Sequence, residues 1–119
     1  DGTLRAFINV CKHRAHELLQ GEGNIGHIMC PYHAWAYRLD GRLQVAPHTK
    51  SLKGFDKSDV CLDQVQVEAF CGFIFVNLDP DAKPMDDCFP GVRDEVVAFV
   101  PHIADLKPLE WVEIPENCN

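Results

Sequence analysis

Long apolar runs and positive charge are both scarce in this 119-residue chain. No apolar stretch approaches the ~20 residues that span a bilayer, and no basic-then-apolar leader opens the sequence. Eleven Lys and Arg residues stand against eighteen Asp and Glu residues, so the net charge is −7. This balance argues against nucleic acid and anionic membrane surfaces as partners. It would suit docking to a basic patch on another protein.

Several signatures of catalysis are also missing. The sequence has no Gly-rich phosphate loop, no Ser/His/Asp order, no internal repeat and no low-complexity segment. Its length and its 46% apolar content are those of one globular domain. The nearest candidates for an acid/base pair are expected instead to flank the start of a helix, where the helix dipole favours acids. They are Asp86, Asp87, Asp94 and Glu95.

The six cysteines do not form the pattern of a small secreted disulfide scaffold. Two of them lie beside histidines, and we expect these two, Cys11 and Cys30, to be metal ligands. The others are expected to be free thiols, which indicates a reducing compartment such as the cytoplasm. They are Cys61, Cys71, Cys88 and Cys118.

Alternation of apolar and polar residues predicts a mainly β fold of small antiparallel sheets. An Asp-Gly pair at 40–41 predicts a hairpin turn, and Gly72 separates two further alternating runs. The predicted strands lie at 4–10, at 26–30, on both sides of the Asp40-Gly41 turn, on both sides of Gly72 within 61–79, and at 109–115.

Two segments do not follow the strand pattern. Residues 46–60 are polar and contain Pro and Gly, which predicts a long surface loop. Valines at helical spacing between Pro90 and Pro101 predict one short helix.

The chemistry is concentrated in Cys11-x-His13 and, after a gap of sixteen residues, Cys30-x-x-His33. Two thiolates and two imidazoles could bind one zinc ion, but Cys-x-His is tighter than the usual spacing of structural zinc ligands. The alternative is a [2Fe–2S] cluster of the Rieske type, in which two His replace two Cys on one iron. We expect the two Cys to bind the inner iron and the two His to bind the outer, solvent-facing one.

At these loops, "CKHRAH" at 11–16 and "CPYHAW" at 30–35, the sequence resembles the Rieske domain in the large (α) subunit of Rieske non-haem iron oxygenases. Asn9, "LLQGEG" at 18–23 and "GFIFVNLDP" at 72–80 extend this resemblance over most of the chain. The second loop looks closest to the branch that acts on carnitine, choline and related quaternary amines, and ring-hydroxylating oxygenases share much of it.

Two loop residues depart from the family's commonest pattern. Ala15 and Ala34 stand where Gly is usual, and we expect the loops to keep their shape if the φ angles there are negative. Arg14 is open to two interpretations, a surface charge or a hydrogen-bond donor that stabilises the first loop.

Aromatic residues distinguish the chain from respiratory Rieske proteins, which the loops also resemble. Tyr32 stands where those proteins have a loop Cys that forms a disulfide, and Trp35 stands where they have a Ser donor. Both devices are therefore absent, and we expect a potential near the low end of the Rieske range. Tyr32 and Trp35 are expected to be core residues or to shield the cluster. Tyr37 matches a Tyr that donates a hydrogen bond to a ligand sulfur.

The remaining histidines are expected to lie on the surface. They are His16, His27, His48 and His102. For His48 we keep a second interpretation open, in which its loop folds over the cluster.

The resemblance implies one-electron transfer. We expect residues 1–119 to be a Rieske domain that lacks its first strands and a following catalytic domain. The parent would be an oxidoreductase, a monooxygenase or dioxygenase. It would accept electrons from a reductase or ferredoxin and pass them to a mononuclear non-haem Fe(II) in a neighbouring subunit, within a homotrimer or hetero-hexamer. A stand-alone Rieske-type ferredoxin is the alternative.

Overall fold

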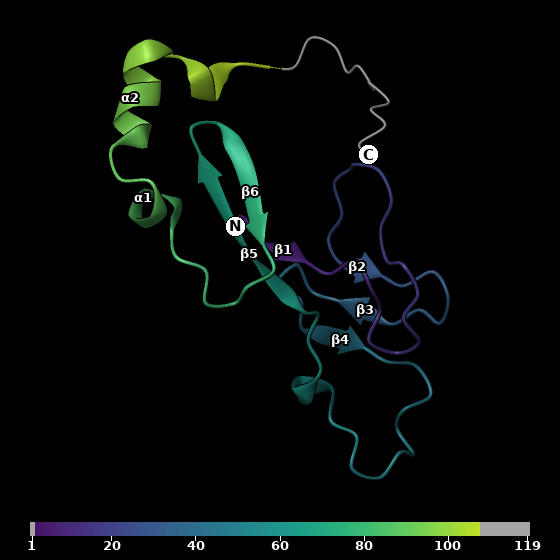
Figure 1. Ribbon diagram of the computed structural model, residues 1–119. Coiled ribbons are helices and arrows are strands. Elements are labelled where there is room, and N and C mark those ends of the chain that lie inside the picture. Colours follow the sequence, from purple (N-terminus) through teal and green to yellow (C-terminus); the bar gives the residue numbers. More distant parts are fainter. Residues whose placement is uncertain (1, 108–119) are drawn as a thin grey trace, which may run out of the picture. The chain divides into compact units, whose positions relative to one another are not determined.

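The computed structural model describes residues 2–107 and confirms the mainly β fold with small antiparallel sheets (Figure 1). The strands are β1 (Ala6–Phe7), β2 (Ile28–Met29), β3 (Ala36–Tyr37), β4 (Leu43–Val45), β5 (Gln64–Phe70) and β6 (Phe73–Asn77). The helices are α1 (Met85–Cys88) and α2 (Val92–Phe99), with 3₁₀ turns at Lys57–Asp59 and Ile103–Asp105. None of the helices in the described part is both long and apolar enough to cross a membrane.

The chain divides into two compact units. Within residues 2–107, the first comprises residues 2–67 and 76–82, and the second comprises residues 68–75 and 83–107. The strands form one sheet in the order β1-β5-β6 and another in the order β2-β3-β4. The division crosses β5 and β6, so the base of this hairpin belongs to the first unit and its tip to the second.

The core of the first unit lies around the β2-β3-β4 sheet. Tyr37 on β3 is fully buried, and the two loop cysteines are each 2% exposed. Burial of these side chains is the main favourable term for this small unit. The buried cluster consists of Cys11, Leu18, Ile28, Cys30, Trp35, Tyr37, Leu43 and Leu62.

The predicted turn between β3 and β4 is present. Arg38 N–H donates to Arg42 O at 2.9 Å, and Gly41 has a φ of +87°. A Cβ atom at Gly41 would lie 2.6 Å from Phe7 Cε1, so both the backbone angle and the packing require glycine.

The first predicted strand is shorter than the alternation over 4–10 indicates. Only Ala6 and Phe7 pair with β5. After that, Val10 N–H donates to Ile8 O at 2.7 Å, a three-residue turn that ends the ladder. The chain then enters the first loop, and Val10 forms only an isolated bridge with Glu17.

The second hairpin turn is also as predicted. Figure 1 shows β5 and β6 running in opposite directions, and Cys71 and Gly72 between them have φ angles of 50° and 83°. Two positive φ angles are typical of the two-residue turn that matches strand twist. A Cβ at Gly72 would lie 2.7 Å from Ala104 Cα.

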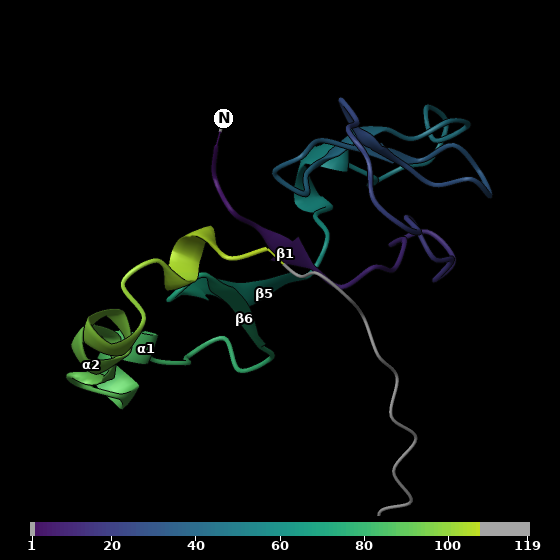
Figure 2. The same ribbon diagram turned by 90° about the horizontal axis from the view of Figure 1, so that it is seen from above.

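The predicted helix is α2, which follows Gly91 and precedes Pro101. A second, one-turn helix, α1, was not predicted, because four residues are too few to show a helical period. Figures 1 and 2 both show α1 close to α2. The predicted strand at 109–115 lies outside the described residues, and the predicted loop at 46–60 contains only a 3₁₀ turn.

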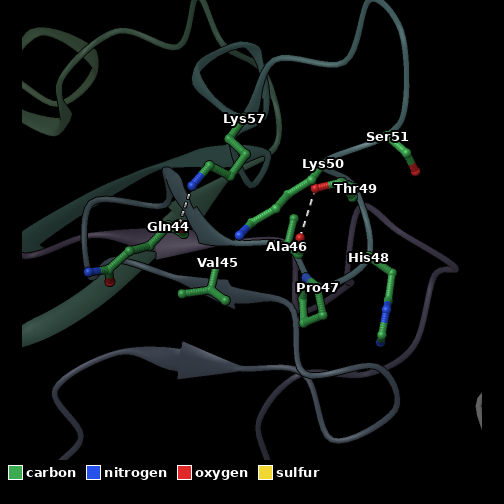
Figure 3. A pocket seen from close by; sticks show the side chains of 9 residues that line it. All are labelled: Gln44, Val45, Ala46, Pro47, His48, Thr49, Lys50, Ser51 and Lys57. Atoms are coloured by element: carbon green, nitrogen blue, oxygen red, sulfur yellow. Dashed lines mark hydrogen bonds between the residues drawn. The ribbon is translucent and has the colours of Figure 1, made fainter.

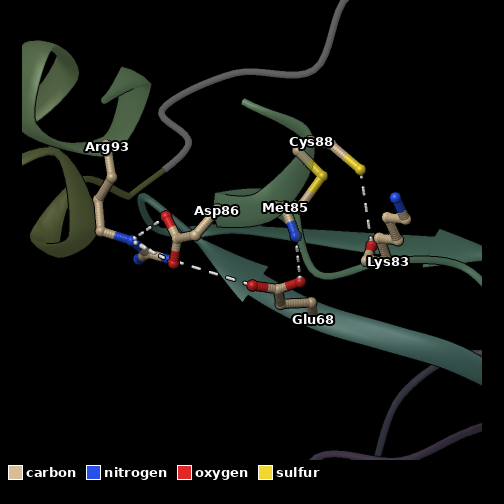
Figure 4. A network of polar contacts seen from close by, with 6 residues as sticks. All are labelled: Glu68, Lys83, Met85, Asp86, Cys88 and Arg93. Atoms are coloured by element: carbon tan, nitrogen blue, oxygen red, sulfur yellow. Dashed lines mark hydrogen bonds and ion pairs between the residues drawn. The ribbon is translucent and has the colours of Figure 1, made fainter. Parts of the chain in front are cut away.

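An ionic network joins α1, α2 and β5 (Figure 4). The Arg93 guanidinium donates to both oxygens of Asp86, with the shortest distance 2.8 Å, and lies 4.4 Å from the centre of the Phe70 ring. Glu68 accepts from the N–H of Met85 at 2.9 Å, which satisfies a free donor at the start of α1. The hydrogen bonds from Arg93 lower the pKa of Asp86.

This network predicts a pH effect on stability. Because the folded-state pKa of Asp86 is depressed, its contribution is present above the ordinary pKa of about 3.9 and is lost as the pH falls through the folded value. Asp86→Asn should therefore lower stability at pH 7 and weaken the loss of stability on acidification. Urea unfolding between pH 7 and pH 2 measures both effects. Asp87→Asn is the control, since Asp87 forms no ion pair within residues 2–107; an equal effect of both variants would contradict the prediction.

Candidate metal centre

The two Cys/His loops have the same backbone arrangement. In the first, Cys11 N–H donates to His16 O at 2.8 Å and Ala15 N–H donates to Cys11 O at 2.9 Å. In the second, Cys30 N–H donates to Trp35 O at 2.8 Å and Ala34 N–H donates to Cys30 O at 3.1 Å. Each loop is thus closed between its cysteine and the fifth residue after it.

The two loop alanines do not have the expected backbone angles. The φ angle is 53° at Ala15 and 55° at Ala34, in the left-handed region. The expectation that φ is negative at these two alanines is therefore wrong. The loops adopt left-handed angles there at a cost of about 1–2 kcal/mol for each L-residue. The reason is the loop closure itself, because a chain that folds back on its own cysteine within five residues needs one left-handed residue.

The loops bring the four candidate ligands together at one end of the first unit. The rings of His13 and His33 are 4.7 Å apart between centroids, and both cysteines are buried. His13 is exposed and His33 is half-buried, so the imidazoles lie on the solvent side of the thiols.

Aromatic rings pack on both sides of the two histidines. Trp35 stacks on His13 with a centroid distance of 4.8 Å and an interplanar angle of 4°. Tyr32 lies 3.8 Å from the His33 ring. Trp35 is buried and belongs to the core, whereas Tyr32 is 55% exposed and covers His33 from outside. The two expected functions, core and shielding, are thus divided between these residues.

Tyr37 links the first loop to the core. Its hydroxyl oxygen accepts from the Lys12 N–H at 3.0 Å and lies 3.2 Å from Cys11 Sγ. Burial, and next the contact with Cys11, raise the pKa of Tyr37, so its hydroxyl stays protonated. With the Lys12 N–H occupying the oxygen, the hydroxyl hydrogen is available to Cys11. A thiolate at Cys11 would accept it.

His33 has an unused nitrogen. Its Nδ1 is buried and has no hydrogen-bond partner among residues 2–107, which is unusual for a buried polar atom. Burial lowers the pKa of His33, and the charges of His13, Arg14 and His16 lower it further. The neutral imidazole favoured in this way is the form that binds a metal.

These residues provide the donor set of a [2Fe–2S] cluster of the Rieske type. Two buried thiols and an orphaned imidazole nitrogen are suitable donors for iron. The tight Cys-x-His spacing remains the reason to prefer this cluster to a single zinc ion.

Two side-chain contacts that the sequence analysis did not assign hold the first loop in place. Lys12 Nζ is 2.5 Å from Asp63 Oδ1, just before β5. Asn9 Nδ2 donates to Leu19 O at 2.7 Å, and Leu19 N–H donates to Asn9 Oδ1 at 3.0 Å. Asn9 was noted only as part of the resemblance, and no spacing rule signals the pairing of Lys12 with Asp63.

The 46–60 loop lies beside the histidines. A cavity of about 680 Å³ is lined by His13 and His33 on one side and by Pro47, His48 and Phe55 on the other. Phe55 packs against the Trp35 ring at 5.8 Å. His48 itself is exposed, as the surface interpretation expects, and its loop lines one side of this cavity. That the loop folds over the cluster stays a prediction.

The other candidate residues lie on the surface. Arg14 is exposed and forms no hydrogen bond or ion pair in the part of the chain that the structure describes, which favours a surface charge over a loop-stabilising donor. His16 is exposed, and its Nδ1 is 2.6 Å from Glu17 O. His27 and His102 are exposed, as expected. Among the other cysteines, Cys61, Cys71 and Cys88 are free, and Cys118 lies outside the described residues.

Comparison with known proteins identifies related sequences and structures. The family model described as the Rieske [2Fe-2S] domain matches residues 1–56. The carnitine monooxygenase oxygenase subunit of Escherichia coli (strain K12) is 41% identical over an alignment of 127 residues, which covers 98% of this chain and 34% of that protein. The large oxygenase component of the naphthalene 1,2-dioxygenase system of Pseudomonas putida is 41% identical over 91 residues, which cover 73% of this chain and 20% of that protein.

A solved structure is similar in fold as well. The crystal structure of a quaternary ammonium Rieske monooxygenase in complex with L-carnitine has a TM-score of 0.81 and 42% identity, and the match covers 87% of this chain and 30% of that chain. The chain therefore spans about a third of the length of the carnitine monooxygenase subunits it matches.

The left-handed alanines predict a stability gain. Ala15→Gly and Ala34→Gly should each raise the free energy of unfolding by about 0.5–1 kcal/mol, because relief of the positive φ exceeds the entropy cost of glycine. Urea unfolding measures the change. Ala46→Gly is the control at a residue whose φ is not positive, and it should destabilise the protein. A loss of stability in all three variants would show that the loop angles carry no strain.

Proposed function

The chain belongs to the family of Rieske domains found in the large subunits of Rieske oxygenases, and from this we propose that it transfers single electrons through a [2Fe–2S] cluster bound between its two loops. The proposed ligands are Cys11, His13, Cys30 and His33. The observation that carries the assignment is the pairing of two buried thiols with an imidazole whose buried Nδ1 has no partner among the described residues.

When bound, such a cluster supplies a one-electron redox couple whose potential His ligation raises above that of all-Cys clusters. The chain's own residues would hold and tune it. Cys11 and Cys30 lie in the core, where water is excluded. Tyr37 directs its hydroxyl at Cys11, and such a bond favours the more negative, reduced state. The exposed edge of His13, backed by Trp35, is the route by which a partner approaches most closely.

The wider function is proposed from the relatives. This chain would act as the electron-transfer part of an oxygenase, an oxidoreductase whose mononuclear Fe(II) and substrate pocket lie in sequence outside this chain. A reductase or ferredoxin would supply the electrons, and a neighbouring subunit in a homotrimer or hetero-hexamer would receive them. The full alignment with carnitine monooxygenase subunits supports a quaternary amine as the substrate class, in preference to an aromatic ring. The cytoplasmic location stays a prediction.

The stand-alone carrier remains the second candidate. The match to oxygenase subunits over 98% of the chain favours the oxygenase. The coding sequence on either side distinguishes the two, because an oxygenase requires a further domain with two His and one carboxylate as iron ligands.

The ligand assignment predicts the outcome of single substitutions. Cys11→Ser and His33→Asn should abolish the visible absorption and the reduced-state EPR signal of a Rieske cluster, since each removes one of four protein ligands. His16→Asn is the matched control in the same loop and should retain both signals. Full signals in His33→Asn would remove His33 from the site.

The aromatic residues predict the redox potential. The midpoint should lie in the lower part of the Rieske range of about −150 to +300 mV, and a value above about +200 mV would contradict the proposal. Tyr37→Phe should lower the midpoint by about 40 mV, which corresponds to about 1 kcal/mol of hydrogen-bond energy for a one-electron couple. Tyr32→Phe is the control, because the Tyr32 hydroxyl makes no hydrogen bond within residues 2–107. Redox titration followed by EPR or circular dichroism gives these values. An equal shift in both variants would contradict the claim that the Tyr37 hydroxyl tunes the potential through Cys11.

A further inference from the structure

Charge is unevenly distributed along the chain. Residues 1–56 contain seven basic and five acidic residues, a net charge of +2 with His neutral. Residues 57–119 contain four basic and thirteen acidic residues, a net charge of −9. The overall charge of −7 therefore does not describe the part of the chain that carries the two loops.

The surface around the candidate ligands is basic. In the cavity beside His13 and His33, every other ionisable lining residue is basic: Lys12, Arg14 and His48. Lys12 is paired with Asp63, but Arg14 forms no ion pair within the described residues, so its charge is uncompensated.

A second basic cavity adjoins the first. It has a volume of about 600 Å³ and shares Pro47, His48 and Thr49 with it, and its other ionisable lining residues are Lys50 and Lys57. Figure 3 shows both lysines reaching toward Gln44, and Lys57 Nζ donates to Gln44 O at 3.1 Å. A backbone carbonyl orients this ammonium group, and its charge is near enough to Asp56 to contribute to the lowered pKa of that carboxyl.

We propose that these residues form a cationic face that docks an acidic patch on the redox protein exchanging electrons at His13 and His33. The face consists of Lys12, Arg14, Lys50 and Lys57. It rests on the proposed function and specifies the chemistry of the partner.

The cationic face reverses the expectation from net charge, which favoured a basic partner. Charges more than about 10 Å apart are largely screened at physiological salt, so an approaching protein responds to the charges it contacts. Opposite charges at the point of contact steer the encounter and set its rate and orientation more than its affinity. Electron exchange needs a fast encounter in one orientation. Positive charge beside the two histidines would orient the partner so that its redox centre faces them.

Small ionic oxidants test the local charge directly. The reduced holo-domain gives one electron to each ferricyanide ion, which becomes ferrocyanide, and stopped-flow absorption follows the rate. If the cationic face controls access, the rate with this anion should fall as salt rises, and Arg14→Glu should lower the low-salt rate by about tenfold. Hexaammineruthenium(III), a cation, should show the opposite salt dependence and a faster rate with Arg14→Glu.

Arg38→Glu is the control with the same change of charge. Arg38 is exposed and follows β3, at the end of the strand away from the second loop. It should change the ferricyanide rate by less than about twofold. A ferricyanide rate that rises with salt, or an equal effect of Arg38→Glu and Arg14→Glu, would overturn the proposal.

Binding gives a readout that involves no electron transfer. A fluorescein-labelled polyglutamate peptide should bind the oxidised holo-domain at low salt, and Lys50→Glu should weaken this binding about tenfold while Arg38→Glu leaves it unchanged. Absence of binding, or equal loss in both variants, would contradict an acid-binding face. A domain without a Rieske EPR signal would instead contradict the proposed function, so the two failures are distinguishable.

Discussion

The buried hydroxyl of Tyr37 joins the two halves of the candidate centre. Tyr37 lies on β3, two residues after the second loop closes at Trp35, and its hydroxyl contacts Cys11 Sγ and the Lys12 N–H of the first loop. One side chain thus sets the distance between loops that are separated by the whole 17–29 segment. Because Tyr37 has no exposed surface, this link is also part of the core, and the site cannot move without repacking it.

Rigidity at this end of the unit has an energetic cost. Ala15 and Ala34 both adopt left-handed angles that glycine adopts freely. Two hydrogen bonds close each loop, and the buried cysteines, Tyr37 and Trp35 hold the loops in place. Strain that the surrounding packing maintains is common at functional sites. The proposed cluster, whose charge would change by one electron, would benefit from ligands that do not rearrange.

The net charge of the protein does not describe the charge of its individual surfaces. The acidic residues are concentrated after residue 56, whereas the histidine edge is lined by basic residues. The 46–60 loop contributes His48, together with Lys50 and Lys57 of the adjoining cavity, and Phe55 packs against Trp35. The same loop that borders the cavity therefore also determines what kind of surface can approach it.

Local patterns were sufficient to predict much of this molecule. The Asp40-Gly41 turn, the hairpin at Gly72 and α2 follow from turn chemistry and periodicity, which act between neighbours in the chain. The Cys and His spacing likewise determined the candidate ligands and the family. The sequence alone could not determine the sign of φ at Ala15 and Ala34, the one-turn helix α1, or the pairing of Lys12 with Asp63. These features depend on which distant segments of the chain pack together in the core. Contacts between distant segments have no fixed spacing in the sequence, so the backbone angles and ion pairs that they impose cannot be read from it.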